Sequence, residues 1–253
     1  MPQRICQRTD SIRRAFRKLL CAVLALSVWP SARALSEDAT LTAAERKIVE
    51  ALQSPTELDF VVTPLVDVVE HLKKRHHIDI EIRRDIPGES GFEKGVTRKI
   101  KGVSLGSVLR LILDQLGLAQ VITHEVVFIT TPEDAQRLIK EGAIDPSAYK
   151  PPRAAEIHKK IVAALKARIS LQLVEVPLDE AIEHLKAICG IEIQIDDRGL
   201  GNAHVQRDTT CNVNVKDIPL ESALGALLKP LGLVAIAEDE YLLVTRQRNS
   251  ASN

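Results

Sequence analysis

The sequence is poor in aromatic residues. Phe, Trp and Tyr make up 3% of the 253 residues, whereas all apolar types together make up 45%. Aromatic side chains supply the platforms on which nucleic-acid bases stack, so a stacking-based binding site has little material here. The core of the fold must therefore be aliphatic, built from Leu, Ile, Val and Ala.

The sequence also lacks a hydrophobic run long enough to cross a membrane. The best candidate, Leu19–Trp29, covers 11 residues, and a helix needs about 20 to cross the hydrocarbon core. Basic residues precede this run, and Pro30 and the small-x-small site Ala32–Ala34 follow it, as in a secretory signal peptide. We expect residues 1–34 to be a signal peptide cleaved after Ala34, which predicts a periplasmic protein without a membrane span. A signal kept as a membrane anchor is the alternative.

Neither sign of charge dominates the whole sequence, which has 34 basic and 34 acidic residues. The predicted signal peptide contains seven of the basic residues and one of the acidic ones, so 27 and 33 remain, a net charge of −6. Nucleic-acid binding needs clustered Lys and Arg that neutralise phosphates. We therefore expect no nucleic-acid partner.

Cysteine is scarce, and two of the four cysteines lie within the predicted signal peptide. Cys189 and Cys211 remain in the exported protein. An oxidising compartment permits a disulfide between them. Their spacing alone leaves two states open, a disulfide or two free thiols.

One sequence unit occurs twice. At an offset of 113 residues, PLVDVVEHLKKRHHIDIEI from Pro64 aligns with PLDEAIEHLKAICGIEIQI from Pro177. Further along, at an offset of 115, VSLGSVLRLILDQLGL from Val103 aligns with IPLESALGALLKPLGL from Ile218. The duplication predicts two similar domains, the second with two extra residues in a loop.

Apolar periodicity predicts the elements of each unit. In the first unit, residues 65–72 and 105–116 repeat apolar side chains at helical spacing, and residues 78–82 alternate as a half-buried strand does. A closing hairpin follows at residues 119–130, and each unit is preceded by a helix that begins near Ala43 or Ala154. The predicted fold is α+β, with two tandem β-α-β-β-α-β-β repeats, each with two helices packed on small sheets. We expect these repeats at residues 41–131 and 154–248, joined by a helical and Pro-rich linker at 132–153.

Both units resemble the short N-terminal domain shared by bacterial secretins and TonB-dependent signal transducers. In that family, a helix opened by Pro-Leu leads to an apolar-x-apolar strand, and a second helix of the pattern v-s-l-x-x-a-L precedes a closing hairpin. The resemblance covers nearly all of the chain after the predicted signal. It implies a periplasmic module that holds or docks a protein partner and has no catalysis and no cofactor. No segment matches the barrel or pore region of the large family members, so we expect no pore.

A histidine cluster is the candidate metal site. It comprises His71, His76, His77, His184 and Cys189. Zinc needs three or four converging ligands, and the i, i+5 spacing of His71 and His76 does not place them on one helical face. His77 aligns with Gly190, which suits a residue that ends a helix with positive φ. We expect no metal site, and a metal-dependent enzyme that uses this cluster is the weaker alternative.

Enzyme activity is not expected from the remaining motifs. The sequence contains no Gly-x-Ser-x-Gly motif and no phosphate-binding loop, and neither Cys189 nor Cys211 lies in a local catalytic signature. Paired acids such as Asp196–Asp197 are interpreted as solvated charges.

Two loops differ between the units although the scaffold around them repeats. They are residues 83–99 and 198–210, and the first mixes charge with Gly, Pro and Phe. The predicted partner contacts are Arg83, Arg84, Phe92, Lys94 and Arg98. An exposed hairpin edge that accepts a partner strand is a second candidate, and a plain solvent loop is the alternative. The expected partner is an envelope protein, and a structural adaptor that self-associates through the repeats is the alternative function.

Overall fold

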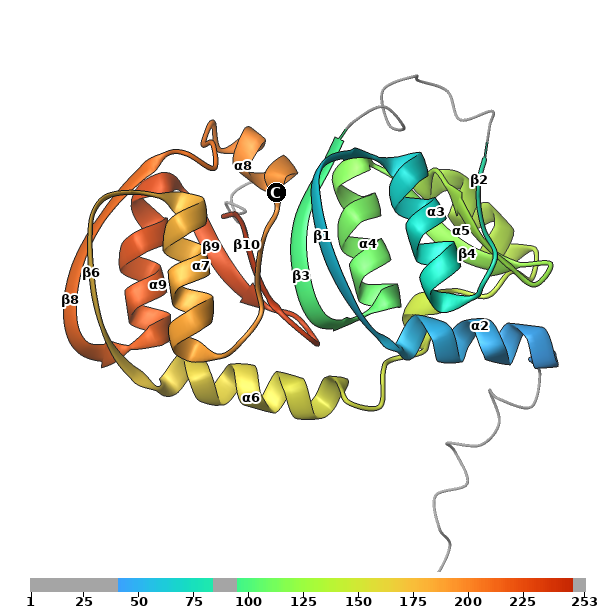
Figure 1. The fold of residues 1–253 in the computed structure, drawn as a ribbon, viewed down its shortest axis with the longest axis horizontal. Coiled ribbons are helices and arrows are strands. Elements are labelled where there is room, and N and C mark those ends of the chain that lie inside the picture. The colour runs from blue at the N-terminus through green and yellow to red at the C-terminus, as the bar shows by residue number, and fades with distance from the viewer. Residues whose placement is uncertain (1–40, 84–94, 248–253) are drawn as a thin grey trace, which may run out of the picture. The chain divides into compact units, whose positions relative to one another are not determined.

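The structure is a computed structural model that describes residues 41–83 and 95–247. The predicted signal peptide lies outside these residues. Helices and small sheets form an α+β fold, as predicted (Figure 1). Contacts between residues group the chain after Thr42 into one compact unit. Within the described residues, no helix combines the length and apolar character needed to span a membrane.

The described residues of the first half form three helices and five strands. They are α2 (Ala43–Gln53), β1 (Pro55–Pro64), α3 (Leu65–His76), β2 (Ile80–Ile82), β3 (Gly95–Ser104), α4 (Leu105–Leu116), β4 (Ala119–Thr123) and β5 (Val126–Thr130). The long strands β1 and β3 pair antiparallel, and the short strands form a separate sheet in the order β2-β5-β4. The two helices α3 and α4 lie between these sheets (Figure 1).

The second half has the same order of these elements and also contains two short helices, α8 and η3. Its elements are α6 (Ala154–Lys166), β6 (Arg168–Pro177), α7 (Leu178–Cys189), β7 (Ile193–Ile195), α8 (Asp197–Asn202), β8 (Thr210–Pro219), α9 (Leu220–Leu228), η3 (Lys229–Leu231), β9 (Leu233–Ala237) and β10 (Leu242–Arg246). Strands β6 and β8 pair antiparallel, and the other three form a sheet in the order β7-β10-β9. Both leading helices begin where the sequence predicts, at Ala43 and Ala154.

Equivalent irregularities interrupt the long strands of both halves. The β1–β3 register shifts between Thr56 and Glu57 and again between Phe60 and Thr63. The β6–β8 register shifts at the corresponding places, between Ile169 and Leu171 and between Leu173 and Val176. Such β-bulges bend a strand and increase its local twist. Figure 1 shows the long strands arching past the helix pair in each half.

Prolines and left-handed residues define the helix ends. Three of the described helices begin directly after a proline, which occupies the N-cap position. These prolines are Pro64 of α3, Pro177 of α7 and Pro219 of α9. Helix α3 ends at His77 with φ of 53°, and α7 ends at Gly190 with φ of 63°. The prediction that His77 fills a helix-stop position is therefore confirmed.

The core is aliphatic, as the composition requires. In the second half, buried side chains from both helices and both sheets form one cluster that includes Leu178, Ile182, Leu185, Ile193, Leu220, Leu224, Leu227, Leu242 and Val244. The corresponding positions of the first half, such as Leu65, Leu109, Val127 and Ile129, are fully buried. Burial of one such side chain contributes about 1.5–3 kcal/mol.

The predicted linker packs against the first half. It contains α5 (Pro132–Lys140) and the short 3₁₀ helix η2 (Pro146–Ala148). Thr131 caps α5 by accepting a hydrogen bond from the backbone N–H of Asp134. After α5, Ile144 exchanges two backbone hydrogen bonds of 2.9 Å with Ile122 on the outer edge of β4. The linker therefore covers one sheet edge of the first half.

The two predicted loops contain regular structure. Strand β3 already begins at Gly95, so residues 95–99 are not loop. Helix α8 occupies residues 197–202 of the second loop despite two glycines, which are poor helix formers. Leu200 is buried, and a side chain at Gly199 would collide with Thr245 Oγ1. Tertiary packing of α8 on β10 thus overrides its low helical propensity.

Equivalent core leucines provide a test of the fold. We expect Leu109→Ala and Leu224→Ala each to lower the free energy of unfolding by about 2–5 kcal/mol, because both leave a cavity among aliphatic neighbours. Urea denaturation measures the loss. Ile188→Ala, at a side chain that is 47% exposed, is the control and should cost much less. Equal losses at all three positions would contradict the assigned core.

Candidate protein-binding surface

The structure describes two of the five predicted partner-binding residues. Arg84, Phe92 and Lys94 lie outside the described residues. Arg83 follows β2 and forms an ion pair with Asp134 of α5. Arg98 lies in β3 and is 3% exposed, so it does not belong to an exposed loop as predicted.

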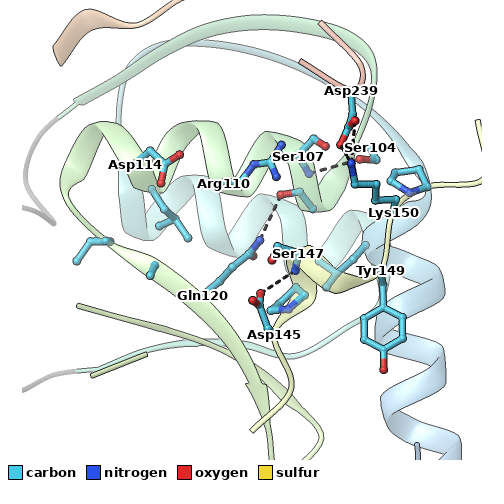
Figure 2. Close-up of a pocket in the computed structure, with 17 residues that line it drawn as sticks. Ser104, Ser107, Arg110, Asp114, Gln120, Asp145, Ser147, Tyr149, Lys150 and Asp239 are labelled. Atoms are coloured by element: carbon cyan, nitrogen blue, oxygen red, sulfur yellow. Dashed lines mark hydrogen bonds and ion pairs between the residues drawn. The ribbon is translucent and has the colours of Figure 1, made fainter. Parts of the chain in front are cut away.

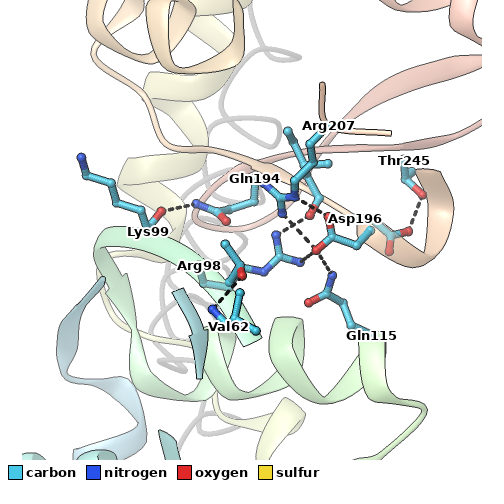
Figure 3. Close-up of polar contacts among 11 residues, drawn as sticks. Val62, Arg98, Lys99, Gln115, Gln194, Asp196, Arg207 and Thr245 are labelled. Atoms are coloured by element: carbon cyan, nitrogen blue, oxygen red, sulfur yellow. Dashed lines mark hydrogen bonds and ion pairs between the residues drawn. The ribbon is translucent and has the colours of Figure 1, made fainter. Parts of the chain in front are cut away.

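Arg98 instead links the two halves of the chain. Its guanidinium donates a hydrogen bond to the backbone carbonyl of Ile195, at the end of β7, and its Nη2 lies 3.5 Å from Asp197 Oδ2 (Figure 3). Beside it, Gln194 Nε2 donates to the carbonyl of Lys99 over 3.0 Å. Polar contacts thus join β3 of the first half to β7 and α8 of the second.

Burial is costly for the Arg98 cation. Desolvation lowers the pKa of Arg98 to about 10, although Asp197 acts in the opposite direction. Its Nε atom has no hydrogen-bond partner among the described residues. A buried ion pair of this kind contributes little net stability, but removing one partner leaves the other groups unsatisfied.

Asp197 is the acceptor at the centre of this cluster. It receives hydrogen bonds from Arg207 Nε at 2.6 Å and from Gln115 Nε2 at 2.5 Å, in addition to the charge of Arg98. Burial acts to raise the pKa of Asp197, but the hydrogen bond from Arg207 and the charge of Arg98 outweigh burial and lower the pKa. Asp197 is therefore held by Arg207, Gln115 and Arg98, but its side chain is still 39% exposed, so its interpretation as a solvated charge is correct only in part.

A second buried contact joins the halves at Glu240. This residue is 3% exposed, and its Oε2 accepts hydrogen bonds from the hydroxyl of Ser104 and, over 3.2 Å, from the backbone N–H of Ser104. Ser104 is also the N-cap of α4. A carboxylate at a helix N-terminus is favourable because it faces the positive end of the helix dipole.

The sequence does contain a signal for this contact between the halves. When the 115-residue offset is extended backwards, Arg98 aligns with Val213 and Ser104 aligns with Pro219. Val213 is buried in the core of the second half. Arg98 is charged where the other copy has the apolar Val213. Such a difference between copies indicates that the charged residue makes a contact that the other copy lacks.

A pair of exposed valines marks the strongest candidate binding surface. Val61 and Val62 lie in the second bulge of β1 and are 73% and 70% exposed, and Val66 in the first turn of α3 is 51% exposed. We call these three residues the valine patch. Isolated exposed apolar side chains are common on proteins, but several together often mark an interaction site.

The backbone of the valine patch is also strained. Val62 has φ of 48°, a conformation that β-branched residues rarely adopt. The bulge leaves the N–H of Val62 without a backbone partner on β3. This N–H instead donates a hydrogen bond to Thr97 Oγ1 over 3.0 Å (Figure 3). In the second half, Glu175 has φ of 53° and its N–H donates to Asn212 Oδ1 over 2.9 Å. Both halves therefore have the same bulge, but Glu175 occupies the position of Val62 in the second half.

The histidines of the predicted cluster have separate roles. The rings of His71 and Phe60 meet edge to face at 5.3 Å, and His76 contacts Ser54 Oγ at 3.1 Å and Thr56 Oγ1 at 3.0 Å. His77 is the C-cap of α3. Across residues 41–83 and 95–247, no three His, Cys, Asp or Glu side chains are arranged to hold a metal ion.

Cys189 and Cys211 are free thiols in the structure. Cys211 is buried and Cys189 is half-buried, and burial raises the pKa of both thiols. Of the two states that the spacing leaves open, the structure therefore shows the unpaired one.

A small polar pocket lies between α4, β4 and the linker (Figure 2). Its volume is about 210 Å³, which is below the 300–1,000 Å³ typical of sites for drug-sized ligands. Lys150 on its rim forms a 2.9 Å ion pair with Asp239, and Gln120 donates to the carbonyl of Gly106. Gln120 Oε1 is buried without a hydrogen-bond partner, which suits an ordered water molecule.

No protein-family model matches the chain, and no curated protein matches it either.

The contact between the halves predicts unequal costs for two arginine substitutions. Arg98→Ala should lower the free energy of unfolding by about 2–3 kcal/mol, because the Ile195 carbonyl loses its donor and Asp197 loses a charge partner. Arg207→Ala, at a more exposed partner of the same Asp197, should cost about 1 kcal/mol or less. Denaturant unfolding compares them, and equal losses would contradict a special role for Arg98.

His76 predicts a pH dependence of stability. Desolvation lowers the pKa of His76 below its ordinary 6.5, so the unfolded chain binds a proton more readily than the folded one. The free energy of unfolding should therefore fall as the pH drops through and below 6.5. His76→Gln should weaken this dependence, as measured by urea unfolding at pH 7.5 and 5.5. The same slope in both proteins would assign the effect to other groups.

Proposed function

We propose that the protein is an exported, periplasmic interaction module of the bacterial cell envelope without catalysis of its own. Two tandem domains that resemble the secretin and TonB short N-terminal domain would form its scaffold, and an envelope protein would be its partner. The two helices and two sheets of each half enclose a closely filled aliphatic core. Such a core supports a rigid platform for surface contacts.

The valine patch is the observation that carries this proposal. Val61, Val62 and Val66 expose most of their apolar surface to solvent on an edge strand and the adjoining helix turn. Strand β1 pairs with β3 on one side, and no second partner strand is found among the described residues. Contact with a partner would bury these valines, and the strained bulge keeps them raised from the strand.

The second half supplies an internal comparison. Val174 aligns with Val61 and is 68% exposed, but Glu175 and Asp179 stand where Val62 and Val66 stand in the first half. The charged replacements make an apolar partner surface less favourable there. We therefore assign the apolar contact of the valine patch to the first half.

Site-specific photocrosslinking in intact cells tests the proposal. With benzoylphenylalanine at position 66, we expect one discrete adduct, recovered from the periplasmic fraction. Val62→Asp in the same chain should abolish the adduct, because a buried carboxylate would oppose an apolar contact. Val174→Asp is the matched control and should leave the adduct unchanged.

Two outcomes would contradict the proposal. Absence of any adduct at position 66 would show that the valine patch meets no partner. An adduct with twice the mass of the chain would instead favour the alternative function, an adaptor that self-associates.

A further inference from the structure

The outer faces of the two three-stranded sheets differ in what covers them. In the first half, α5 lies against β4, and Val121 on the outer face is fully buried. Ile236 occupies the equivalent position on β9 and is 44% exposed. The same face of the same sheet is therefore covered by α5 in one half, whereas in the other half it faces α4 of the first half across a groove that leaves Ile236 partly exposed.

Helix α5 shows what kind of segment fits this face. It is short and amphipathic, with Ala135 buried and Leu138 and Ile139 half-buried on one side. At its first turn, Asp134 accepts a hydrogen bond from Thr130 Oγ1 over 2.8 Å and forms an ion pair with Arg83. Apolar contacts and one ion pair thus hold the helix on the sheet.

The outer face of the second-half sheet and α4 of the first half together line a large groove. The groove has a volume of about 1,430 Å³ and is lined by Arg110 and Asp114 of α4, Arg198 of α8, and Ile236 and Leu243 of the sheet. Val234, Ile236 and Leu243 supply apolar side chains from β9 and β10, and the groove also carries charges of both signs. Leu243 aligns with Phe128 of the covered sheet, so the apolar character of this face is kept in both halves.

The charged residue beside this face has the opposite sign in the second half. Thr245 aligns with Thr130, but Asp196 stands where Arg83 stands in the first half. Asp196 Oδ2 accepts a hydrogen bond from Thr245 Oγ1 over 2.7 Å, and a carboxylate has capacity for further donors. A segment that binds here should therefore carry a basic side chain where α5 carries Asp134.

We propose that the groove along β9 and β10 binds a short amphipathic helix of a partner protein, with an apolar face on Ile236 and Leu243 and a basic side chain at Asp196. The proposal rests on the proposed function only in taking the ligand to be a protein segment. Recognition of an apolar helix face by a groove is a recurring mode of peptide binding.

Two stapled peptides provide the probe. The first has the sequence of residues 131–144, with the staple between its exposed positions 133 and 137, because an unstapled helix of this length is marginal in water. The second carries Asp134→Lys as well. Fluorescence anisotropy with the exported chain should show saturable binding of the lysine peptide, about threefold tighter than the unsubstituted peptide, as expected for an exposed ion pair.

Three variants of the chain make the test specific. Ile236→Asp should weaken binding of the lysine peptide at least about tenfold, because an apolar contact is replaced by a charge. Asp196→Asn should remove the preference for the lysine peptide but keep binding of both. Val174→Asp, on the bulge of β6, is the control and should change neither affinity.

Each of the binding measurements has an outcome that would overturn the proposal. It fails if neither peptide binds saturably, if Ile236→Asp binds as tightly as the unsubstituted chain, or if the preference survives Asp196→Asn. A concentration-dependent dimer in sedimentation analysis that Ile236→Asp abolishes would assign the groove to a second copy and overturn it too. Photocrosslinking at position 66 reports on the proposed function separately, since Ile236 is not part of the valine patch.

Discussion

Aliphatic side chains from two helices and two small sheets meet in each half, and their close packing constrains the rest of the structure. Leu and Ile have no flat faces to stack, so the sheets must follow the contour of the helix pair. The long strands do so by bending at bulges, two in each half and at equivalent positions. Each bulge places one residue in the left-handed region, at Gly102, Val62, Asp217 or Glu175. At the second bulge of β1, Val61 and Val62 are exposed.

The two halves show how a repeated scaffold acquires different surfaces. Arg98, Ser104 and Gln194 occupy positions that hold Val213, Pro219 and Glu81 in the other copy, and all three now contact the opposite half. The buried guanidinium is costly, as its lowered pKa shows. The Arg98 cation favours the observed arrangement of β3 against β7, because any other arrangement would leave it buried without Asp197.

Periodicity predicted most of the architecture because each helix and strand buries one face. The helices from Leu65 and Leu178, the alternating isoleucines and the closing hairpins all lie where the apolar pattern places them. The loops were predicted less well, since α8 forms through packing of Leu200 and Gly199 and not through helical propensity. The charge of Arg98 favours an exposed surface, but Arg98 is buried because it contacts the second half, and only its alignment with the apolar Val213 indicates this. The groove at Ile236 depends on which helix covers which sheet, and local sequence does not encode that choice.

The duplicated bulges restrict where this chain tolerates changes in length. Strand residues alternate between faces, so deleting one residue near Val62 would turn every following side chain of β1 to the opposite side. The same holds for β6 near Glu175. Insertions are harmless only where no ladder is interrupted, and the two extra residues of the second copy fall between β7 and β8, beside α8. The difference in length between the two copies therefore falls in the connection that follows the parallel strand.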